Sequence, residues 1–407
     1  MRHFTSRRLH VLVTTTWLPG GTPVWAHEFA NHLAERGYDV HCLYVRPWGI
    51  PLWSPPKFQR GRYQAMYLQV PVPLFLIAVP FFLHAFRRPR RVDVVISSEM
   101  EGSAIPATAR RGSIHHVAAA HTPEPSRVGA WELLTGGLSV MPRLLGRALR
   151  PSSSSPTRVE IAMPWYWQWV HYFGQRRLNN APTVVCVSDH QRRQVERSWR
   201  IDPRKVRVIS DGIDTDRFHP AAPPPSPEDP PRVLYAGGPR WLKGADLALQ
   251  AFARAAHQLP RASLDMVGGF NWGAYERIAE TLGIRDRVRF HPYVAYEVMQ
   301  DFYARSTVCL APSRGESFGR TAAEAMACGR PVISTSVASI PEIIDHGLNG
   351  ILVPGDDVDA LASALIDLVQ DQAVAERLGR AAREKIEDQF AWPRVIDQWE
   401  ELLAGLS

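Results

Sequence analysis

Residues 311–335 read APSRGESFGRTAAEAMACGRPVIST. This stretch holds two carboxylates, Glu316 and Glu324, with seven residues between them. The alanine-rich run 321–328 has good helix propensity and is followed by Gly-Arg-Pro, which is typical of the end of a helix. Residues 331–335 are then typical of a strand. We therefore expect Glu316 in a polar turn before a helix and Glu324 one turn inside that helix.

The start of this predicted helix has the features of an anion site. The backbone amides of Phe318, Gly319 and Arg320 would point out of the first turn, where the helix dipole attracts negative groups. The glycines at 315 and 319 let a ligand approach the backbone closely. A phosphate between two carboxylates suits a nucleotide-sugar, because one carboxylate can bind sugar hydroxyls and the other ribose hydroxyls. The alternative is a solvated loop with a surface glutamate.

The segment PSRGESFGRTAAEAMACGRPVI closely resembles the signature of the retaining glycosyltransferases that have the GT-B fold and a Glu-x7-Glu motif (glycosyltransferase group 1, family 4). The resemblance implies an α/β protein of two Rossmann-like domains whose parallel sheets face a central cleft. It implies that Glu316 orients the transferred sugar and Glu324 the ribose. It also places further donor-binding residues in this turn: Ser317, Phe318, Gly319 and Thr321.

Length and composition agree with two globular domains. A chain of 407 residues is too long for one ordinary domain, and 45% hydrophobic with 21% charged residues leaves ample core. The net charge of +7 suits anionic partners in general, such as phosphates, nucleic acid or an acidic membrane surface. We expect no nucleic-acid partner, because no basic stripe with interleaved aromatics lies on a recognisable module.

The cysteines and the first residues bear on location. The four cysteines lack metal-ligand spacing and sit among apolar neighbours, which predicts buried thiols in a reducing compartment: Cys42, Cys186, Cys309 and Cys328. Residues 1–21 place charges before an apolar run, but the run is short and ends in Pro-Gly-Gly. We interpret it as a first strand rather than a signal peptide, and expect a cytoplasmic protein.

The chain opens with a βαβ pattern: a strand at 9–15, a helix at 24–36 and a strand at 39–45. Gly20 and Gly21 lie at the first strand-to-helix turn, without the G-x-G-x-x-G dinucleotide fingerprint. A turn-only role and contact with a diphosphate both fit these glycines. The family resemblance favours contact with the donor.

Two apolar stretches have more than one interpretation. Residues 70–86 are apolar, broken by proline and followed by a basic run at 87–91. They fit a core helix, or a face pressed into a membrane with arginines at the headgroups. The aromatic cluster at 165–173 fits core packing, an acceptor cleft, a partner or a membrane interface.

His121 follows a predicted strand at 113–120. Ligands in open α/β sheets bind beyond the carboxyl ends of the strands. A lone histidine is usually structural, but family members often have a histidine close to the sugar at this place. The resemblance therefore makes His121 a candidate for contact with the donor or acceptor, and we include it among the candidate catalytic residues.

A second βα series begins at 233–236, after the proline-rich segment 219–232. We expect it to continue with strands at 263–267 and 288–290 and with helices at 246–257, 275–282, 296–305, 358–369 and 373–390. The loop after this strand carries Arg240 and Lys243, which can clamp a diphosphate and neutralise a leaving group; two solvated cations are the alternative. The resemblance favours that role for Lys243, which precedes a glycine as in the family, whereas Arg240 is shifted by two positions. It also implies that the loop at Val294 binds the base through its backbone.

The sequence thus predicts four parts: an acceptor-side domain at 1–218, a linker at 219–232, a nucleotide-sugar domain at 233–390, and a helix at 391–407 that crosses back to the first domain. The resemblance implies a retaining, metal-independent glycosyltransferase of polysaccharide, lipopolysaccharide or glycolipid assembly. It would use a UDP- or GDP-linked sugar as co-substrate, no further cofactor, and a glycan or lipid-linked acceptor, with or without peripheral contact with the inner face of a membrane. The alternatives are an epimerase or phosphorylase of the same fold, or a non-catalytic nucleotide-sugar-binding protein.

Overall fold

The computed structural model describes most of the second half of the chain and separate parts of the first half: residues 9–16, 21–47, 62–70, 93–97, 115–120, 178–179, 181–198, 200–220, 228–269, 271–292 and 294–406. The described residues divide into two compact units. Unit 1 takes the described residues up to Gly212 and again from Trp392 onwards, and unit 2 takes Ile213–Ala391.

Unit 1 is built on a parallel sheet of seven strands in the order β3-β2-β1-β4-β5-β6-β7. The order reverses at β1, from which the chain steps outward first to one side and then to the other, as in doubly wound folds. The strands are β1 (His10–Thr16), β2 (Asp39–Pro47), β3 (Gln64–Val70), β4 (Val94–Ser97), β5 (His115–Ala120), β6 (Thr183–Cys186) and β7 (Val206–Val208).

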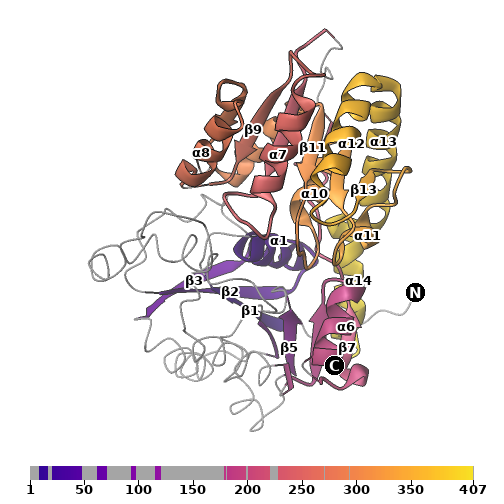
Figure 1. The fold of residues 1–407 in the computed structure, drawn as a ribbon. Coiled ribbons are helices and arrows are strands. Elements are labelled where there is room, and N and C mark those ends of the chain that lie inside the picture. Colours follow the sequence, from indigo (N-terminus) through magenta and orange to yellow (C-terminus); the bar gives the residue numbers. More distant parts are fainter. Residues whose placement is uncertain are drawn as a thin grey trace. The chain divides into compact units, whose positions relative to one another are not determined.

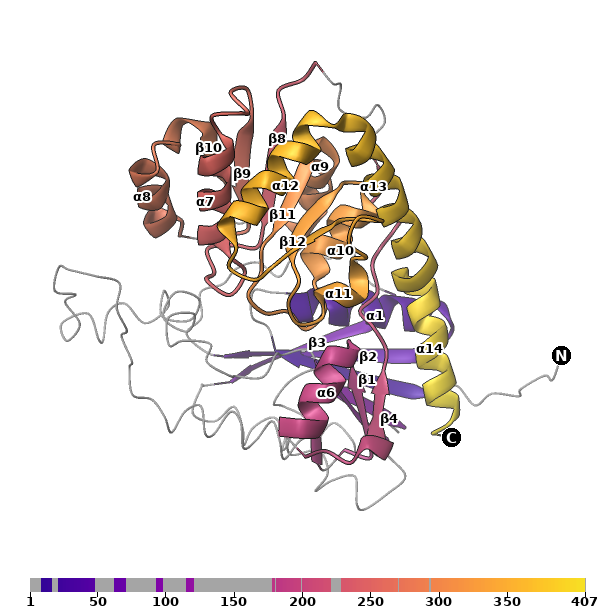
Figure 2. The same ribbon diagram turned by 45° about the vertical axis from the view of Figure 1, so that its right-hand side comes forward.

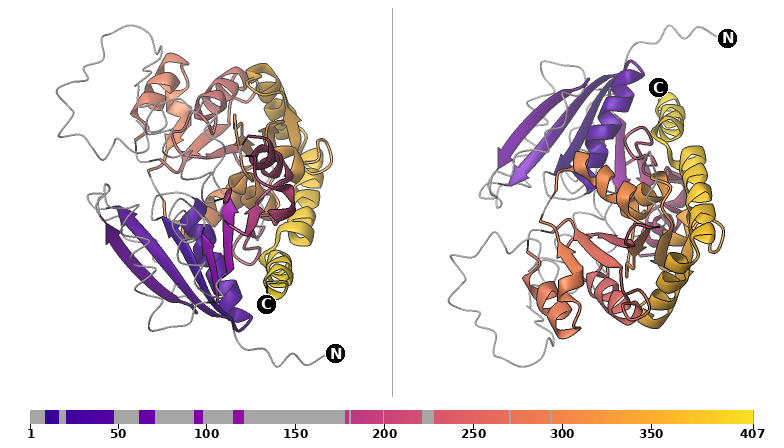
Figure 3. Two further views of the ribbon diagram at one scale, coloured as in Figure 1. Left: turned by 90° about the horizontal axis from the view of Figure 1, so that it is seen from below. Right: turned by 90° about the horizontal axis from the view of Figure 1, so that it is seen from above.

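Helix α1 (Gly21–Glu35) packs along β1 and β2, as Figure 3 shows. Its Phe29 contacts Trp399 of α14 (Trp392–Ala404), with ring centroids 4.8 Å apart. The indole of Trp392 donates a buried hydrogen bond of 3.0 Å to Glu28. The last helix therefore belongs to the core of unit 1, although 179 residues of unit 2, Ile213–Ala391, precede it in the chain.

Two elements of unit 1 were missed from sequence. Strand β3 ends at Val70, the first residue of the apolar stretch 70–86, and the rest of that stretch lies outside the described residues. Helix α6 (Asp189–Ser198) has too few apolar residues to show a periodic face. Its start carries a signal nevertheless: the Ser188 hydroxyl accepts from the Gln191 amide (3.1 Å), while the Gln191 side chain accepts from the Val187 amide (2.9 Å), much as in a capping box.

Unit 2 has a parallel sheet of six strands in the order β10-β9-β8-β11-β12-β13. The order reverses between β8 and β11, which makes this the point where ligands bind in such folds. The strands are β8 (Arg232–Ala236), β9 (Ser263–Val267), β10 (Val288–Phe290), β11 (Val308–Ala311), β12 (Val332–Thr335) and β13 (Ile351–Val353).

Helices cover this sheet, and α7 lies beside α12 over it (Figures 1 and 2). The predicted helices of unit 2 are confirmed, with two corrections: the helix expected at 296–305 opens with a 3₁₀ turn, and the one expected at 373–390 ends in a π-helix. The helices are α7 (Ala245–Ala255), α8 (Gly273–Thr281), α9 (Met299–Arg305), α10 (Arg320–Ala327), α11 (Ile340–Ile343), α12 (Val358–Gln370) and α13 (Gln372–Lys385).

Several predictions fall on residues that the structure does not describe. These are the two roles considered for 71–91, the aromatic cluster at 165–173, and the candidate residues Gly20 and His121. In the described ranges, no helix is both long and apolar enough to cross a bilayer.

Candidate functional site

The site begins with two loops that follow neighbouring strands of unit 2. Residues 237–244 follow β8, and residues 312–319 follow β11. The loops are joined by a backbone hydrogen bond of 2.7 Å from the Arg314 amide to the Leu242 carbonyl. They also touch at Gly244, whose φ is +72° and where an added Cβ would lie 2.0 Å from the Pro312 carbonyl oxygen. Only glycine fits there, because the neighbouring atom belongs to the backbone.

This contact brings together two predicted residues that are 73 positions apart in sequence. The Lys243 ammonium lies 2.7 Å from Oε1 of Glu316. The Ser313 hydroxyl donates to the same oxygen at 2.9 Å. Glu316 is 7% exposed, so its charge is held among these donors rather than in water. The result is a fixed cation–carboxylate pair beyond the carboxyl ends of β8 and β11.

Ser339 stabilises the turn after Glu316 by contacts with its backbone carbonyls. Its hydroxyl lies 3.2 Å from the carbonyl of Glu316 and 3.0 Å from that of Phe318. Gly319 is the N-cap residue of α10 and has φ +108°, and a Cβ there would lie 2.7 Å from the Ile340 side chain. Gly319 has no side chain to cap the first amides of α10, so this helix start can accept an anion.

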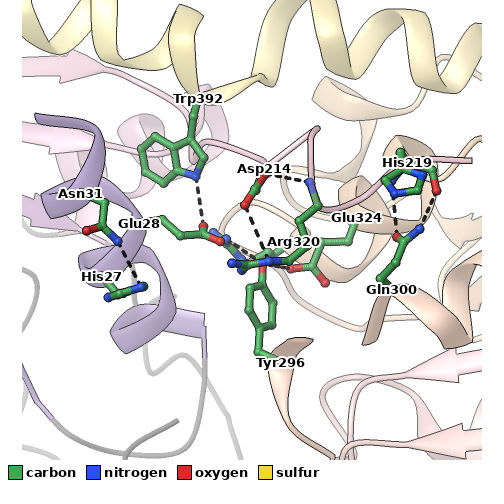
Figure 4. A network of polar contacts seen from close by, with 11 residues as sticks. His27, Glu28, Asn31, Asp214, His219, Tyr296, Gln300, Arg320, Glu324 and Trp392 are labelled. Carbon is green, nitrogen blue, oxygen red and sulfur yellow. Dashed lines mark hydrogen bonds and ion pairs between the residues drawn. The ribbon is translucent and has the colours of Figure 1, made fainter. Parts of the chain in front are cut away.

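Glu324 lies inside α10 and is 3% exposed. Its Oε2 accepts from the Tyr303 hydroxyl (2.9 Å). Its Oε1 accepts from the Tyr296 hydroxyl (3.0 Å) and from Nε of Arg320 (3.1 Å), as Figure 4 shows. Burial, and next the Glu324 charge, raise the pKa of Tyr303 well above its ordinary value, so this hydroxyl remains a donor. Phe218 packs edge-on against both tyrosine rings.

The remaining predicted residues are spread over both units. Ser317 and Thr321 are half-buried beside the turn, and Val294 is half-buried just beyond β10. Arg240 is exposed, and within the described ranges its side chain makes no hydrogen bond or ion pair. Gly21 is the first residue of α1 in unit 1.

The structure therefore brings together the predicted residues of β8, β11 and α10. It adds four side chains that sequence reasoning missed: Ser313, Ser339, Tyr296 and Tyr303. Ser313 lies three positions before Glu316, but this spacing is too common to be a signal. For the other three, no local pattern links them to the residues they contact.

Metal-ligand side chains do not cluster in the part of the chain that the structure describes, where no group of three or more His, Cys, Asp or Glu side chains is arranged to hold an ion. All four cysteines are buried and free, as predicted. Burial raises the pKa of Cys309 to about 11 and that of Cys42 to about 12.

Two protein-family models match the chain in succession. The model of Glycosyltransferase Family 4 matches residues 19–217, and the model of glycosyl transferases group 1 matches residues 218–385. Together they match residues 19–385, which leaves out β1 and α14.

Among curated proteins, the D-inositol 3-phosphate glycosyltransferases of Streptomyces avermitilis and Xylanimonas cellulosilytica are 34% and 31% identical to this chain. The first alignment covers 52% of this chain and 49% of that relative, and the second covers 54% and 57%. The chain thus spans about half the length of the curated relatives it matches.

Among solved structures, the sucrose-phosphate synthase of Thermosynechococcus elongatus has a TM-score of 0.76 at 22% identity and covers 98% of this chain and 99% of its own. Anabaena HepE in complex with UDP-glucose has a TM-score of 0.74 at 16% identity and covers 98% and 100%. Similarity at this level of identity concerns the fold, and it confirms the expected GT-B class with two Rossmann-like parallel-sheet units.

Proposed function

Because this chain belongs to the group 1 glycosyltransferases, we propose that it moves a sugar from a nucleoside-diphosphate sugar to a glycan or lipid-linked acceptor. The observation that carries the proposal is the Lys243–Glu316 pair, which lies at the sheet's reversal point beside the open start of α10. This arrangement offers a cation and helix amides to a diphosphate, next to a carboxylate for sugar hydroxyls.

The chemistry follows from these positions. The bond between the anomeric carbon and the diphosphate oxygen breaks, the acceptor oxygen bonds to that carbon, and the acceptor's hydroxyl proton leaves with the diphosphate. Lys243 and the first amides of α10 stabilise the negative charge that develops on the leaving group, and each such donor lowers the barrier by roughly 3 kcal/mol. Glu316, held by Ser313, orients the sugar hydroxyls.

In the structure Lys243 is already paired with Glu316. A bound diphosphate would compete with Glu316 for the ammonium and leave the carboxylate free to accept from the sugar. Glu324 is assigned to the ribose, which requires ribose hydroxyls to replace or join the hydrogen bonds that Tyr296 and Arg320 now make to Oε1. Val294 would contact the base through its backbone.

The finer assignments rest on the family resemblance. They are retention of the anomeric configuration by attack on the same face, no requirement for a metal ion, and a place in polysaccharide, lipopolysaccharide or glycolipid assembly. Support for the donor class comes from Anabaena HepE, whose structures were solved with UDP and with UDP-glucose. The cytoplasmic location and the peripheral membrane contact stay predictions.

The test measures donor binding and turnover with the purified full chain. A panel of UDP- and GDP-sugars is screened by thermal shift, where a donor at a hundred times its dissociation constant adds about 2.7 kcal/mol of stability. Release of nucleoside diphosphate is then followed for wild type, Glu316→Gln and Lys243→Met. Each variant should lose about 100-fold in rate, whereas Glu280→Gln, an exposed glutamate of α8, should match wild type.

The products separate the remaining alternatives. Transfer to an added glycan without phosphate supports a glycosyltransferase, whereas an epimerised nucleotide-sugar or a requirement for inorganic phosphate indicates the other two enzyme classes. If no donor stabilises the chain, or if Glu316→Gln turns over as fast as wild type, the proposal is wrong.

A further inference from the structure

An exposed tryptophan lies on the same loop as Lys243. Trp241 is 41% exposed, two residues before Lys243 and one after Arg240. Large hydrophobic side chains are seldom exposed in the described parts of the chain, and Trp241 is the only aromatic among them; the others are Val208, Leu282, Val298 and Leu348. An indole left in water at this place needs an explanation, because it has a large apolar surface to bury.

The indole is also held in place. The Arg314 guanidinium lies over one face of the Trp241 ring, 4.5 Å from the ring centroid, and covers that face. Arg314 donates to the Trp241 carbonyl (2.7 Å), to both carboxylate oxygens of Asp246 (2.8 Å each) and to Asp356 (2.6 Å). Its side chain is only 11% exposed. A rotamer-rich arginine is thus fixed by three partners beneath the tryptophan, which presents the indole as a rigid surface.

The strand order, together with the contact between Arg314 and Asp356, indicates on which side of the site this surface lies. Val294 follows β10 at one edge of the sheet, and Asp356 follows β13 at the opposite edge. Lys243 and Glu316 follow the central strands β8 and β11. Arg314 ties Trp241 towards the β13 edge through Asp356. A ligand with its base near β10 and its diphosphate at the centre would therefore extend its sugar towards Trp241.

We propose that the exposed part of the Trp241 indole stacks against a sugar ring of the acceptor. This inference rests on the proposed function, in which Glu316 already holds the transferred sugar, so that the next ring along this edge belongs to the acceptor. A pyranose presents a face of C–H groups, which carry partial positive charge and match the electron-rich face of an indole. Such a contact needs a rigid, partly exposed aromatic ring, as found here.

The experiment measures glycoside binding directly, with UDP present to occupy the donor site. Octyl glycosides of glucose, galactose, mannose and N-acetylglucosamine are titrated against wild type, Trp241→Ala, Trp241→Phe and Leu348→Ala by saturation-transfer NMR. Leu348 is an exposed apolar residue elsewhere in unit 2 and serves as the control. We expect at least one glycoside to bind, a tenfold or larger loss in Trp241→Ala, partial rescue by Trp241→Phe, and no change in the control.

Donor thermal shifts measured on the same variants separate the two proposals. All variants should keep the wild-type shift with the best donor. If the donor shift persists but Trp241→Ala binds glycosides as wild type does, or if wild type binds none, the acceptor role of Trp241 is overturned alone. If Trp241→Ala loses donor binding instead, the ring serves the donor and the acceptor assignment is again wrong. If no donor shifts wild type, the proposed function itself fails.

Discussion

Gly244 offers a test of how the two site loops are held together. Its φ of +72° disfavours any other residue, and an added Cβ would lie 2.0 Å from the Pro312 carbonyl oxygen and 2.8 Å from its carbon. Backbone atoms cannot rotate away as a flexible side chain does. The substitution Gly244→Ala must therefore push apart the loops that carry Lys243 and Glu316.

The magnitude can be separated into two parts with a control from the same unit. Gly283 has φ +69° and nothing within 4 Å of an added Cβ, so Gly283→Ala measures the backbone cost alone, about 1–2 kcal/mol. Gly244→Ala adds the clash, about 1–3 kcal/mol more, for a total of about 2–5 kcal/mol. The reduced freedom of the unfolded chain is the same for both substitutions and cancels in their difference.

The assay is urea unfolding of the full chain. Two units need not unfold in a single step, so the comparison uses the midpoint of the transition that both variants shift. Gly244→Ala should have the lower midpoint and should bind the best donor at least tenfold more weakly. Gly283→Ala should bind it as wild type does. Equal midpoints and equal donor affinities in the two variants would refute the claim that close packing of the loops sets the site.

Two further predictions concern buried groups. Tyr303→Phe keeps the ring packing on Phe218 but removes a hydrogen bond to a charged group, so the free energy of unfolding should fall by about 2 kcal/mol in urea titrations at pH 8. Burial, and next Glu324, raise the pKa of Tyr303 in the folded chain. The contribution of Tyr303 to the free energy of unfolding is therefore complete below the unfolded-state pKa of about 10 and is lost as the pH rises above that value. If Tyr303→Phe lost as much stability as wild type between pH 9 and 11, this reasoning would be contradicted. The native chain should not react with a thiol reagent at pH 8, because its 4 cysteines are buried and burial raises the pKa of Cys309 to about 11 and of Cys42 to about 12. All four cysteines should react after unfolding in guanidinium. Rapid labelling of the native chain would contradict the burial of the cysteines.

Most elements of unit 2 were predictable because they carry their own local signal, whereas α11 and β13 were not predicted. The strands at 263–267 and 288–290 were expected at the residues where they occur, since short β-branched and apolar runs lie between turn residues. In unit 1, helix α6 was not predicted, because a polar surface helix shows no apolar periodicity. Its only sequence signal is the capping residue Ser188. Strand β3 was not predicted, because its last residue, Val70, is also the first residue of the apolar stretch 70–86 and was interpreted as part of that stretch.

The candidate site was predictable where chemistry follows sequence spacing. Glu316 lies in the turn before α10, Glu324 lies inside that helix, and Lys243 precedes a glycine at a strand end. Their residue types and positions along the chain therefore carry the information. The pairing of Lys243 with Glu316 depends on β8 and β11 being neighbours, which is a property of strand order.

By itself the sequence determined the α/β class, the second βα series and the identity of the charged residues at the site, since these depend on local propensity and on short motifs. Only the tertiary structure decided that Tyr303 holds Glu324, that Ser339 supports the turn at Glu316, and that Arg314 lies beneath Trp241. Those contacts join residues 21, 23 and 73 positions apart, and packing of the strands and helices brings them within hydrogen-bond or van der Waals range. No pattern along the chain encodes such distances.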